Sequence, residues 1–541
     1  MRSQRHPLIS CRSPQLPGSV VLELPCEILL EIFDAYRRTF LPDRNSSYER
    51  DWNSSNGWFR LAHVCRGWRQ IVLMSSSRLR LRLFFTPQRT GKAVAIRRLS
   101  PLPIIVDYTG GARTVNEQKR IVSALAYSDR VRQIFFIGAG RGLEKLLEAM
   151  NRPFPALVAF HLHATSHDPY VLPPAFLVSF APSLQHLVLC GITLASALPL
   201  LSNITTLVGL HLEIDTVYCP SSGTSLLTHL QHMPHLRHLR VDVQPFLRAP
   251  AEGPNSIMEN DALLVGVTQL RVSGFTPQIE KLVDGLNTPS LQELQITLFD
   301  PDFQFPGGIS HIYSLIHNAG IVFSAAQIQL LYSMTVVSLV TDSHSLDDPP
   351  FRIIVYNNPS TATISNALSA MLATVEDVYL TAPFIHMFPL GNFVRWRNVF
   401  THFLNVKTLR MHHGQAKEVI SMFRQDSEDG PPATDLSLAE EAAESNATIP
   451  SGLPVIERPF DLDILPSLEV VHVLPAGLAF RGGTCPSSLA SFESFKAARR
   501  RGGRPVEVVL EKGSVLPRYF HCSNYNAKIG LSLPDEFLLR R

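Results

Sequence analysis

A short apolar pattern that returns along most of the chain constrains the fold more than any other feature. The pattern is L-x-x-L-x-L, with other large apolar residues accepted at the leucine positions. Side chains alternate along a strand, so the last two apolar positions face one side and the first lies on the approach. Each unit therefore predicts a strand that neighbouring units must cover. The first position falls at Val131, Leu157, Leu184, Leu207, Leu236, Val267, Leu291, Met334, Val375, Val406 and Leu468.

The spacing of these units and the prolines ahead of them carry the argument, because roughly twenty matches would occur by chance in a chain this apolar. Successive first positions from Val131 to Leu291 are 26, 27, 23, 29, 31 and 24 residues apart, close to the range of about 20–29 residues for leucine-rich repeats. We expect proline to end the preceding helix and to set an extended entry into the strand. Proline stands two residues ahead of five first positions, as Pro155, Pro182, Pro234, Pro289 and Pro466.

Apolar residues at helical spacing lie between the predicted strands, at Ser225 to Met233, Pro277 to Leu286, Thr363 to Ala373 and Asn392 to Leu404. Alternation of strands and helices predicts an α/β fold with a parallel sheet lined by helices. No asparagine follows the strands at a repeated position. We therefore expect an irregular leucine-rich-repeat-like solenoid over 126–541.

The remaining chain divides by composition. Residues 1–20 read as a flexible tail, 21–76 as a helical module with a polar insert at 44–57, and 77–125 as a basic linking segment and solenoid cap. Residues 425–452 are acidic, rich in Pro, Ser and Ala, and lack apolar periodicity, which predicts a disordered loop.

Composition and charge narrow the function. The net charge is +3 and the 7 cysteines form no C-x-x-C pair, which favours neither a polyanionic partner nor a disulfide framework. The N-terminus lacks the apolar core of a signal peptide, so we expect the cytoplasm, the nucleus or both. The stretch Ile321 to Val340 is long enough to span a membrane, but its glutamines and serines favour a buried helix and strand instead.

Motifs for catalysis, metals and cofactors are weak. The glycines in GAGRG, at Gly138, Gly140 and Gly142, do not have the dinucleotide spacing G-x-G-x-x-G. His229, His232, His235 and His238 cannot share one helix face because Pro234 interrupts them. We expect no enzyme activity, no cofactor, no metal site and no nucleic-acid partner.

Two runs of residues resemble the F-box. These are Leu24-Pro25-x-Glu27-Ile28-Leu29-x-x-Ile32-Phe33 and Val64-Cys65-Arg66-x-Trp68-Arg69-x-Ile71. A looser similarity to mushroom-type fungal F-box proteins continues through SSRLRLRLFFTPQRTG and LPIIVDY. The resemblance implies that the module binds the Skp-type linker of a cullin–RING ubiquitin ligase. The implied contact residues are Leu24, Pro25, Ile28, Leu29, Ile32, Phe33, Val64 and Trp68.

The repeat units would then hold a target protein. The residue between the last two apolar positions points away from the core, which places Phe135, His161, Val188, His211, Arg240, Arg271, Gln295, Ser338, Tyr379, Arg410 and His472 on one face. Our target-binding set is His211, Arg240, Arg271, Gln295, Tyr379, Arg410 and His472, with a preference for anionic groups through the arginines. The alternative is a repeat scaffold that has no role in ubiquitin transfer.

Overall fold

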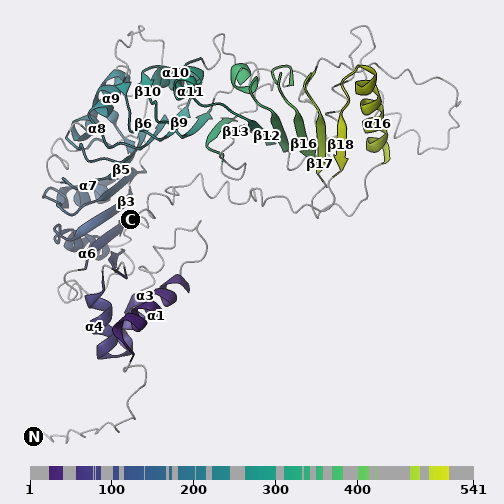
Figure 1. Ribbon diagram of the computed structural model, residues 1–541. Coiled ribbons are helices and arrows are strands. Elements are labelled where there is room, and N and C mark those ends of the chain that lie inside the picture. The colour runs from purple at the N-terminus through teal and green to yellow at the C-terminus, as the bar shows by residue number, and fades with distance from the viewer. Residues whose placement is uncertain are drawn as a thin grey trace, which may run out of the picture. The chain divides into compact units, whose positions relative to one another are not determined.

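A computed structural model describes the helical module, most of the repeat units and the connections between them (Figure 1). The expected tail 1–20, the acidic loop 425–452 and all but the last residue of the insert 44–57 lie outside the described residues. The described residues are 24–39, 57–76, 78–79, 81–86, 102–108, 115–138, 140–165, 170–172, 181–201, 203–214, 222–243, 262–299, 310–331, 334–341, 349–356, 368–381, 400–412, 419, 423, 464–474 and 486–510.

The N-terminal module consists of helices α1 (Cys26–Thr39), α3 (Gly57–Val64) and α4 (Arg66–Met74). Apolar residues recur at helical spacing without a break from Trp58 to Leu73, but the chain breaks at Cys65 and forms two helices. Cys65 is extended, with φ −156° and ψ 174°, and its Sγ accepts a hydrogen bond from the backbone N–H of Trp68 at 3.3 Å. Cys65 therefore caps α4, which no apolar periodicity could have revealed.

Every predicted strand is present. These strands are β3 (Val131–Gly138), β4 (Ala159–Ala164), β5 (His186–Ile192), β6 (Gly209–Ile214), β7 (His238–Val243), β9 (Gln269–Gly274), β11 (Glu293–Leu298), β13 (Met334–Val340), β15 (Asp377–Thr381), β16 (Thr408–His412) and β17 (Val470–Leu474). The structure adds strands that the pattern did not predict, namely β1 (Leu83–Phe85), β2 (Ile104–Tyr108), β12 (Ala325–Leu331), β14 (Phe351–Tyr356), β18 (Glu507–Leu510) and the short pair β8 (Ala262–Leu263) and β10 (Leu286–Asn287).

Within the described residues the main sheet has 16 strands in the order β1-β2-β3-β4-β5-β6-β7-β9-β11-β14-β13-β12-β15-β16-β17-β18. The described pairings are parallel except those of β13, which runs antiparallel to both β12 and β14. The expected all-parallel sheet is therefore wrong at this one place. Only residues 332 and 333 separate β12 from β13, too few for the crossover that a parallel pair requires.

The prolines have a different role from the one expected. In all five units the residue before the proline accepts a backbone hydrogen bond, at 3.1–3.2 Å, from the N–H of the first apolar position. Proline thus occupies the second position of a four-residue turn, where its fixed φ near −65° is favoured. Pro234 illustrates the arrangement, because the N–H of Leu236 donates to the carbonyl of Met233. The proline shapes a tight turn before the strand and does not itself begin an extended segment.

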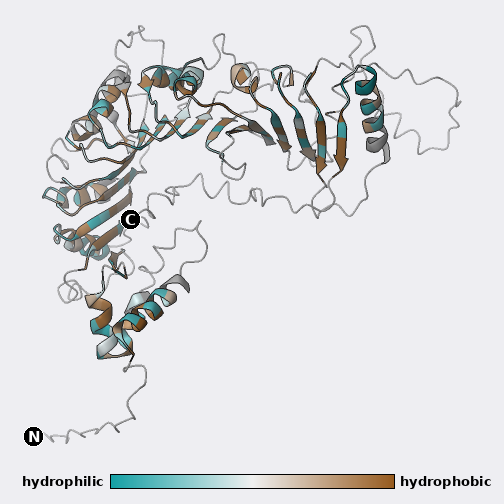
Figure 2. Ribbon diagram, in the orientation of Figure 1, coloured by the Kyte–Doolittle hydropathy of each residue, from teal (hydrophilic) through white to brown (hydrophobic). Residues whose placement is uncertain are grey.

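The connecting helices are α6 (Val115–Leu125), α7 (Gly140–Ala149), α8 (Leu194–Leu201), α9 (Ser222–Gln231), α10 (Thr276–Asp284), α11 (Ser310–Asn318) and α16 (Pro486–Arg501). Helices α9 and α10 confirm two predicted helices. Residues 368–372 are helical, within the predicted helix Thr363 to Ala373, and the predicted helix Asn392 to Leu404 falls largely outside the described residues. Helices α8 to α11 lie along one side of their strands (Figure 1). Hydrophobic and hydrophilic residues alternate along the strands, as Figure 2 shows.

The chain divides into two compact units. The first contains Met1–His167 and Ala175–Leu187 together with Asn526–Arg541, and the second contains Asp168–Pro174 and Val188–Tyr525. In the second unit, a Cβ on Gly274 would lie 2.9 Å from the Val243 Cβ and 3.3 Å from Ile279 Cδ1 of α10. Gly274 shares its side of β9 with the buried Leu270 and Val272. That side therefore faces the helices, and Arg271 faces away from them.

The described residues of the apolar stretch Ile321 to Val340 include the antiparallel strands β12 and β13 and no helix. The helix expected there is wrong, whereas the expected burial is confirmed for Ala326, Ile328 and Val337. Within the described residues, no helix has both the length and the apolar character needed to cross a membrane.

Candidate functional site

Helix α1 divides its apolar residues between two neighbouring stripes. Leu29 and Phe33 are four residues apart and buried, whereas Ile28 and Ile32, also four residues apart, are 47% and 42% exposed. Residues at this spacing lie one above the other on a helix. One stripe therefore completes the core of the module, and the other faces outward.

Helices α3 and α4 close this small core. Trp58 and Val72 are fully buried, and the Trp68 ring meets the Phe33 ring edge-on, with 4.8 Å between centroids. Val64, at the end of α3, is 59% exposed. The module thus has its own core and still leaves large aliphatic side chains in solvent.

The eight residues expected to contact the linker therefore fall into two groups. Leu29 and Phe33 lie inside the module, and Leu24 and Trp68 are partly covered. Pro25, Ile28, Ile32 and Val64 are exposed. Only the exposed and partly covered residues can touch a partner directly, so Leu29 and Phe33 would act by holding α1 in place.

The basic residues near this module are not all free for a partner. Arg78 forms ion pairs with Glu31 and Asp34 of α1, and the guanidinium of Arg69 donates to the carbonyl of Ala62 at 2.9 Å. Arg60 and Arg66 remain exposed. An acidic partner would therefore meet fewer cations here than the sequence suggests.

The second surface is a line of side chains across the sheet. All seven residues of the expected target-binding set belong to it, because each is paired in register with its neighbour on the next strand. We call it the transverse row: His211, Arg240, Arg271, Gln295, Arg352, Ser338, Gln327, Tyr379, Arg410, His472 and Val509.

Two buried side chains near the middle of the transverse row separate two partly exposed ends. Ser338 and Gln327, near its middle, are 2% and 3% exposed, and the residues on both sides are partly exposed. The expected exposure of Ser338 is wrong, because β13 is buried on both faces from 335 to 340. Phe135, in the first unit, is also buried and stacks on His161 with 4.6 Å between ring centroids.

Sequence reasoning missed three members of the transverse row, Arg352, Gln327 and Val509, and Arg352 is the charged one. Its strand, β14, has no apolar residue three positions ahead of Phe351, so the repeat pattern passed over it. The available signal was the short run of β-branched and aromatic residues in FRIIVY after Pro349 and Pro350. Arg352 lies between Gln295 and Ser338 in register.

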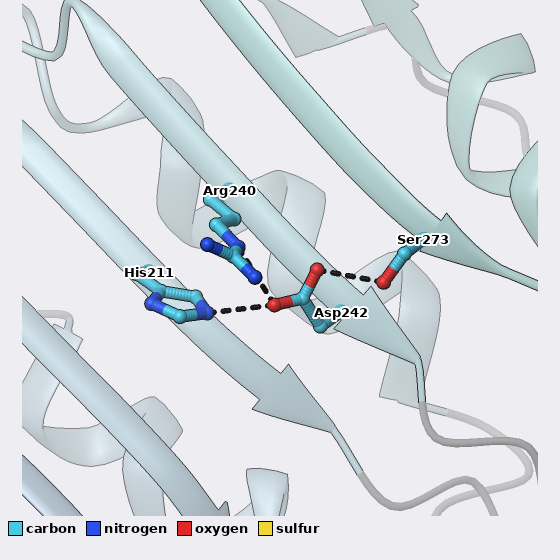
Figure 3. A network of polar contacts seen from close by, with 4 residues as sticks. All are labelled: His211, Arg240, Asp242 and Ser273. Atoms are coloured by element: carbon cyan, nitrogen blue, oxygen red, sulfur yellow. Dashed lines mark hydrogen bonds and ion pairs between the residues drawn. The ribbon is translucent and has the colours of Figure 1, made fainter. Parts of the chain in front are cut away.

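At the end of the transverse row that begins with His211, the Asp242 carboxylate binds three side chains (Figure 3). The Asp242 Oδ2 atom lies 2.8 Å from His211 Nε2 and 2.7 Å from Arg240 Nε, and Ser273 Oγ donates to Oδ1 at 2.7 Å. Burial opposes ionisation of Asp242, but the hydrogen bond from His211, the charge of Arg240 and the hydrogen bond from Ser273 outweigh it. Together they hold the pKa of Asp242 below its ordinary value.

The other end of the row carries a cation–π contact. The Arg410 guanidinium lies 4.9 Å from the centroid of the Tyr379 ring. The Arg410 Nε atom is buried without a hydrogen-bond partner. His472 is the in-register neighbour of Arg410.

The serine, histidine and cysteine side chains at the Asp242 end of the row are held by hydrogen bonds or by burial. Ser273 and His211 each bind the Asp242 carboxylate, so the network lacks the order of nucleophile, base and acid in which the imidazole would lie between serine and aspartate. Burial, with the nearby Glu213 carboxylate, raises the pKa of the Cys190 thiol, which disfavours the reactive thiolate. Within the described residues, no three His, Cys, Asp or Glu side chains gather as a metal site.

No protein-family model matches the chain, and no curated protein matches it at a significant level.

Proposed function

We propose that the chain is a substrate-recognition adaptor of a Skp–cullin–F-box ubiquitin ligase. The helical module would dock on the Skp-type linker, and the transverse row, on a leucine-rich-repeat-like sheet, would hold the target. The observation that carries the proposal is the outward stripe of Ile28 and Ile32, with Val64, on a module whose own core is complete. The resemblance of this segment to the F-box supplies the identity of the partner.

The energetics favour a partner for this stripe. Burying each aliphatic side chain contributes roughly 1.5–3 kcal/mol, before the cost of association is subtracted. A helix that inserts apolar residues four positions apart into a groove is a common mode of recognition. Ile28 and Ile32 have this spacing, and Leu29 and Phe33 fix α1 from beneath.

The adaptor would act by tethering. With one surface on the ligase and the other on the target, lysines of the target remain close to the activated ubiquitin at high effective concentration. The bond-forming chemistry belongs to other subunits, and no catalytic group is required from this chain.

The test is capture of a purified Skp-type linker by the full chain. We expect Ile28→Ala/Ile32→Ala to weaken capture by about tenfold or more, because two buried aliphatic contacts are lost. The matched control is Val265→Ala/Val322→Ala, which removes two exposed aliphatic side chains of the second unit. Circular dichroism would verify that both variants are folded.

Equal capture by both double variants, or no capture by the parent, would favour the second candidate. In that case the chain is a repeat scaffold whose helices cap the first strands. The ion pairs from Arg78 to Glu31 and Asp34 favour this reading, because they fasten α1 to the segment that leads into β1.

A further inference from the structure

The transverse row is free of acidic residues, although acids occur on the same face. None of its eleven residues, all within the described part of the chain, is Asp or Glu, and four are arginines. Asp242 lies two residues after Arg240, and Glu293 lies two residues before Gln295. The carboxylates therefore flank the row and do not interrupt it.

Three of the four arginines of the row lie within four neighbouring strands, with Arg240 on β7, Arg271 on β9 and Arg352 on β14. Arg240 and Arg271 are direct neighbours in register, and Gln295 separates Arg271 from Arg352. Adjacent strands are about 4.8 Å apart, so the three guanidinium stems start within about 15 Å of one another. Like charges placed directly opposite each other destabilise a sheet. Arg240 and Arg271 are such a pair.

Asp242 compensates only one member of this pair. Arg240 Nε is bound to the Asp242 carboxylate at 2.7 Å, and Arg271 makes no hydrogen bond or ion pair within the described residues. Glu293 is diagonal to Arg271, and its in-register neighbour is Gln269. Arg271 is only partly exposed, so its charge is less well solvated than that of a surface arginine.

We propose that Arg271, with Gln295 and the charge of Arg352, binds an acidic segment of the captured protein through its carboxylate or phosphoryl oxygens. Arg271 offers a planar fork of donors that matches either group, and Gln295 adds an amide N–H. Asp242 lowers the positive potential at the Arg240 end and so limits the site to Arg271 and its neighbours. The inference rests on the proposed function only in taking the captured protein to be the ligase target.

A protein segment fits this site better than a nucleic acid. Single strands are held by aromatic platforms on which bases stack. The aromatic member of the row, Tyr379, lies beyond the buried Ser338 and Gln327, and its ring carries the Arg410 guanidinium. Near Arg271 the row offers arginines, a glutamine and a histidine.

The experiment is fluorescence anisotropy of the full chain with labelled probe peptides, without the linker. One probe alternates glutamate and serine, a second replaces glutamate with phosphoserine, and a control replaces it with glutamine. We expect Arg271→Gln to weaken binding of the better anionic probe roughly tenfold or more, because a charge-assisted hydrogen bond is lost. Arg237→Gln, which removes an exposed arginine outside the row, should stay within about twofold of the parent.

A second variant should act in the opposite direction. Asp242→Asn removes the carboxylate that compensates Arg240, so the anionic probe should bind several-fold more tightly. Tighter binding of the phosphoserine probe or of the glutamate probe would each support the site and would identify the oxygen it prefers.

Equal effects of Arg271→Gln and Arg237→Gln, equal binding of the glutamine control, or tighter binding of an oligothymidylate would overturn the inference. Capture of the linker is measured on the same Arg271→Gln protein. It should be unchanged, because the linker-binding residues lie in the helical module, so failure of one proposal can be distinguished from failure of the other. Loss of linker capture by Ile28→Ala/Ile32→Ala concerns the adaptor proposal alone.

Discussion

At the scale of single residues, Asp242 shows how one carboxylate decides which cations of a row remain available. It collects His211, Arg240 and Ser273 from three neighbouring strands. Because the carboxylate binds donors in its ionised form, its pKa in the folded protein lies below the ordinary value. The same contacts that hold three strands together thus compensate the charge of Arg240.

This arrangement predicts a pH-dependent contribution to stability. A depressed pKa in the folded state stabilises the fold above the unfolded value of about 4, and this contribution is lost as the pH falls through the folded pKa. We expect Asp242→Asn to lower stability at neutral pH by about 1–3 kcal/mol, and the difference from the parent to shrink below about pH 4. Thermal unfolding at neutral and acidic pH measures both.

Ser273→Ala is the control, because it removes one donor and leaves the carboxylate. It should retain the pH-dependence of the parent. A difference between Asp242→Asn and the parent that does not change with pH would contradict this account.

At the scale of elements, short polar interactions set boundaries that apolar periodicity cannot show. The Cys65 Sγ atom caps α4 and divides a continuous apolar stripe into two helices. Proline at the second position of a turn fixes the entry to the repeated strands. Both devices satisfy backbone groups at an element's end, where the apolar pattern carries no information.

The cap at Cys65 leads to a prediction about the helical module. Serine is a better N-cap acceptor than cysteine, and alanine is none. Cys65→Ala should therefore destabilise the module by about 0.5–1 kcal/mol, and Cys65→Ser should match the parent or exceed it. Thermal unfolding followed by far-ultraviolet circular dichroism would rank the variants.

Cys26→Ser provides the control, because Cys26 is an exposed free cysteine at the first residue of α1. If Cys65→Ser were less stable than Cys65→Ala, the capping role would be excluded.

At the scale of the whole molecule, the two compact units have separate sets of buried residues. The first includes Leu29, Phe33 and Trp58 of the helical module, and the second includes Leu239 and Leu270 beneath the transverse row. In a stacked repeat protein each unit contacts mainly its neighbours, so damage stays local. The two proposed binding functions should therefore fail separately.

Core truncation tests this separation. Leu239→Ala removes a side chain that is 2% exposed and should cost about 2–5 kcal/mol. Limited proteolysis should then cut the second unit faster, and linker capture should persist. Leu61→Ala, in the core of the module, is the reciprocal variant and should reduce linker capture. Loss of linker capture in the Leu239→Ala protein would show that the units do not act independently.

The sequence by itself determined where eleven strands lie and which of their side chains share a face, because alternation along a strand is a local property. It did not determine that Phe135 and Ser338 on that face are buried. It also indicated Ile28, Leu29, Ile32 and Phe33, which form the two stripes of α1, as residues of the F-box-like run. It did not determine which of those stripe residues stay exposed, since Leu29 and Ile28 differ only in what packs against them.

Only the tertiary structure decided which strands are neighbours. The β12–β13 hairpin reverses one strand and brings β14 beside β11, so Arg352 joins Gln295 in register across a gap of more than fifty residues. The pairing of Asp242 with His211 and Ser273, and the lack of an ionic partner for Arg271 among the described residues, depend on which side chains of neighbouring strands meet in space. Local patterning assigns a residue to a face, but electrostatic compensation is a property of neighbours, and neighbours are set by the fold.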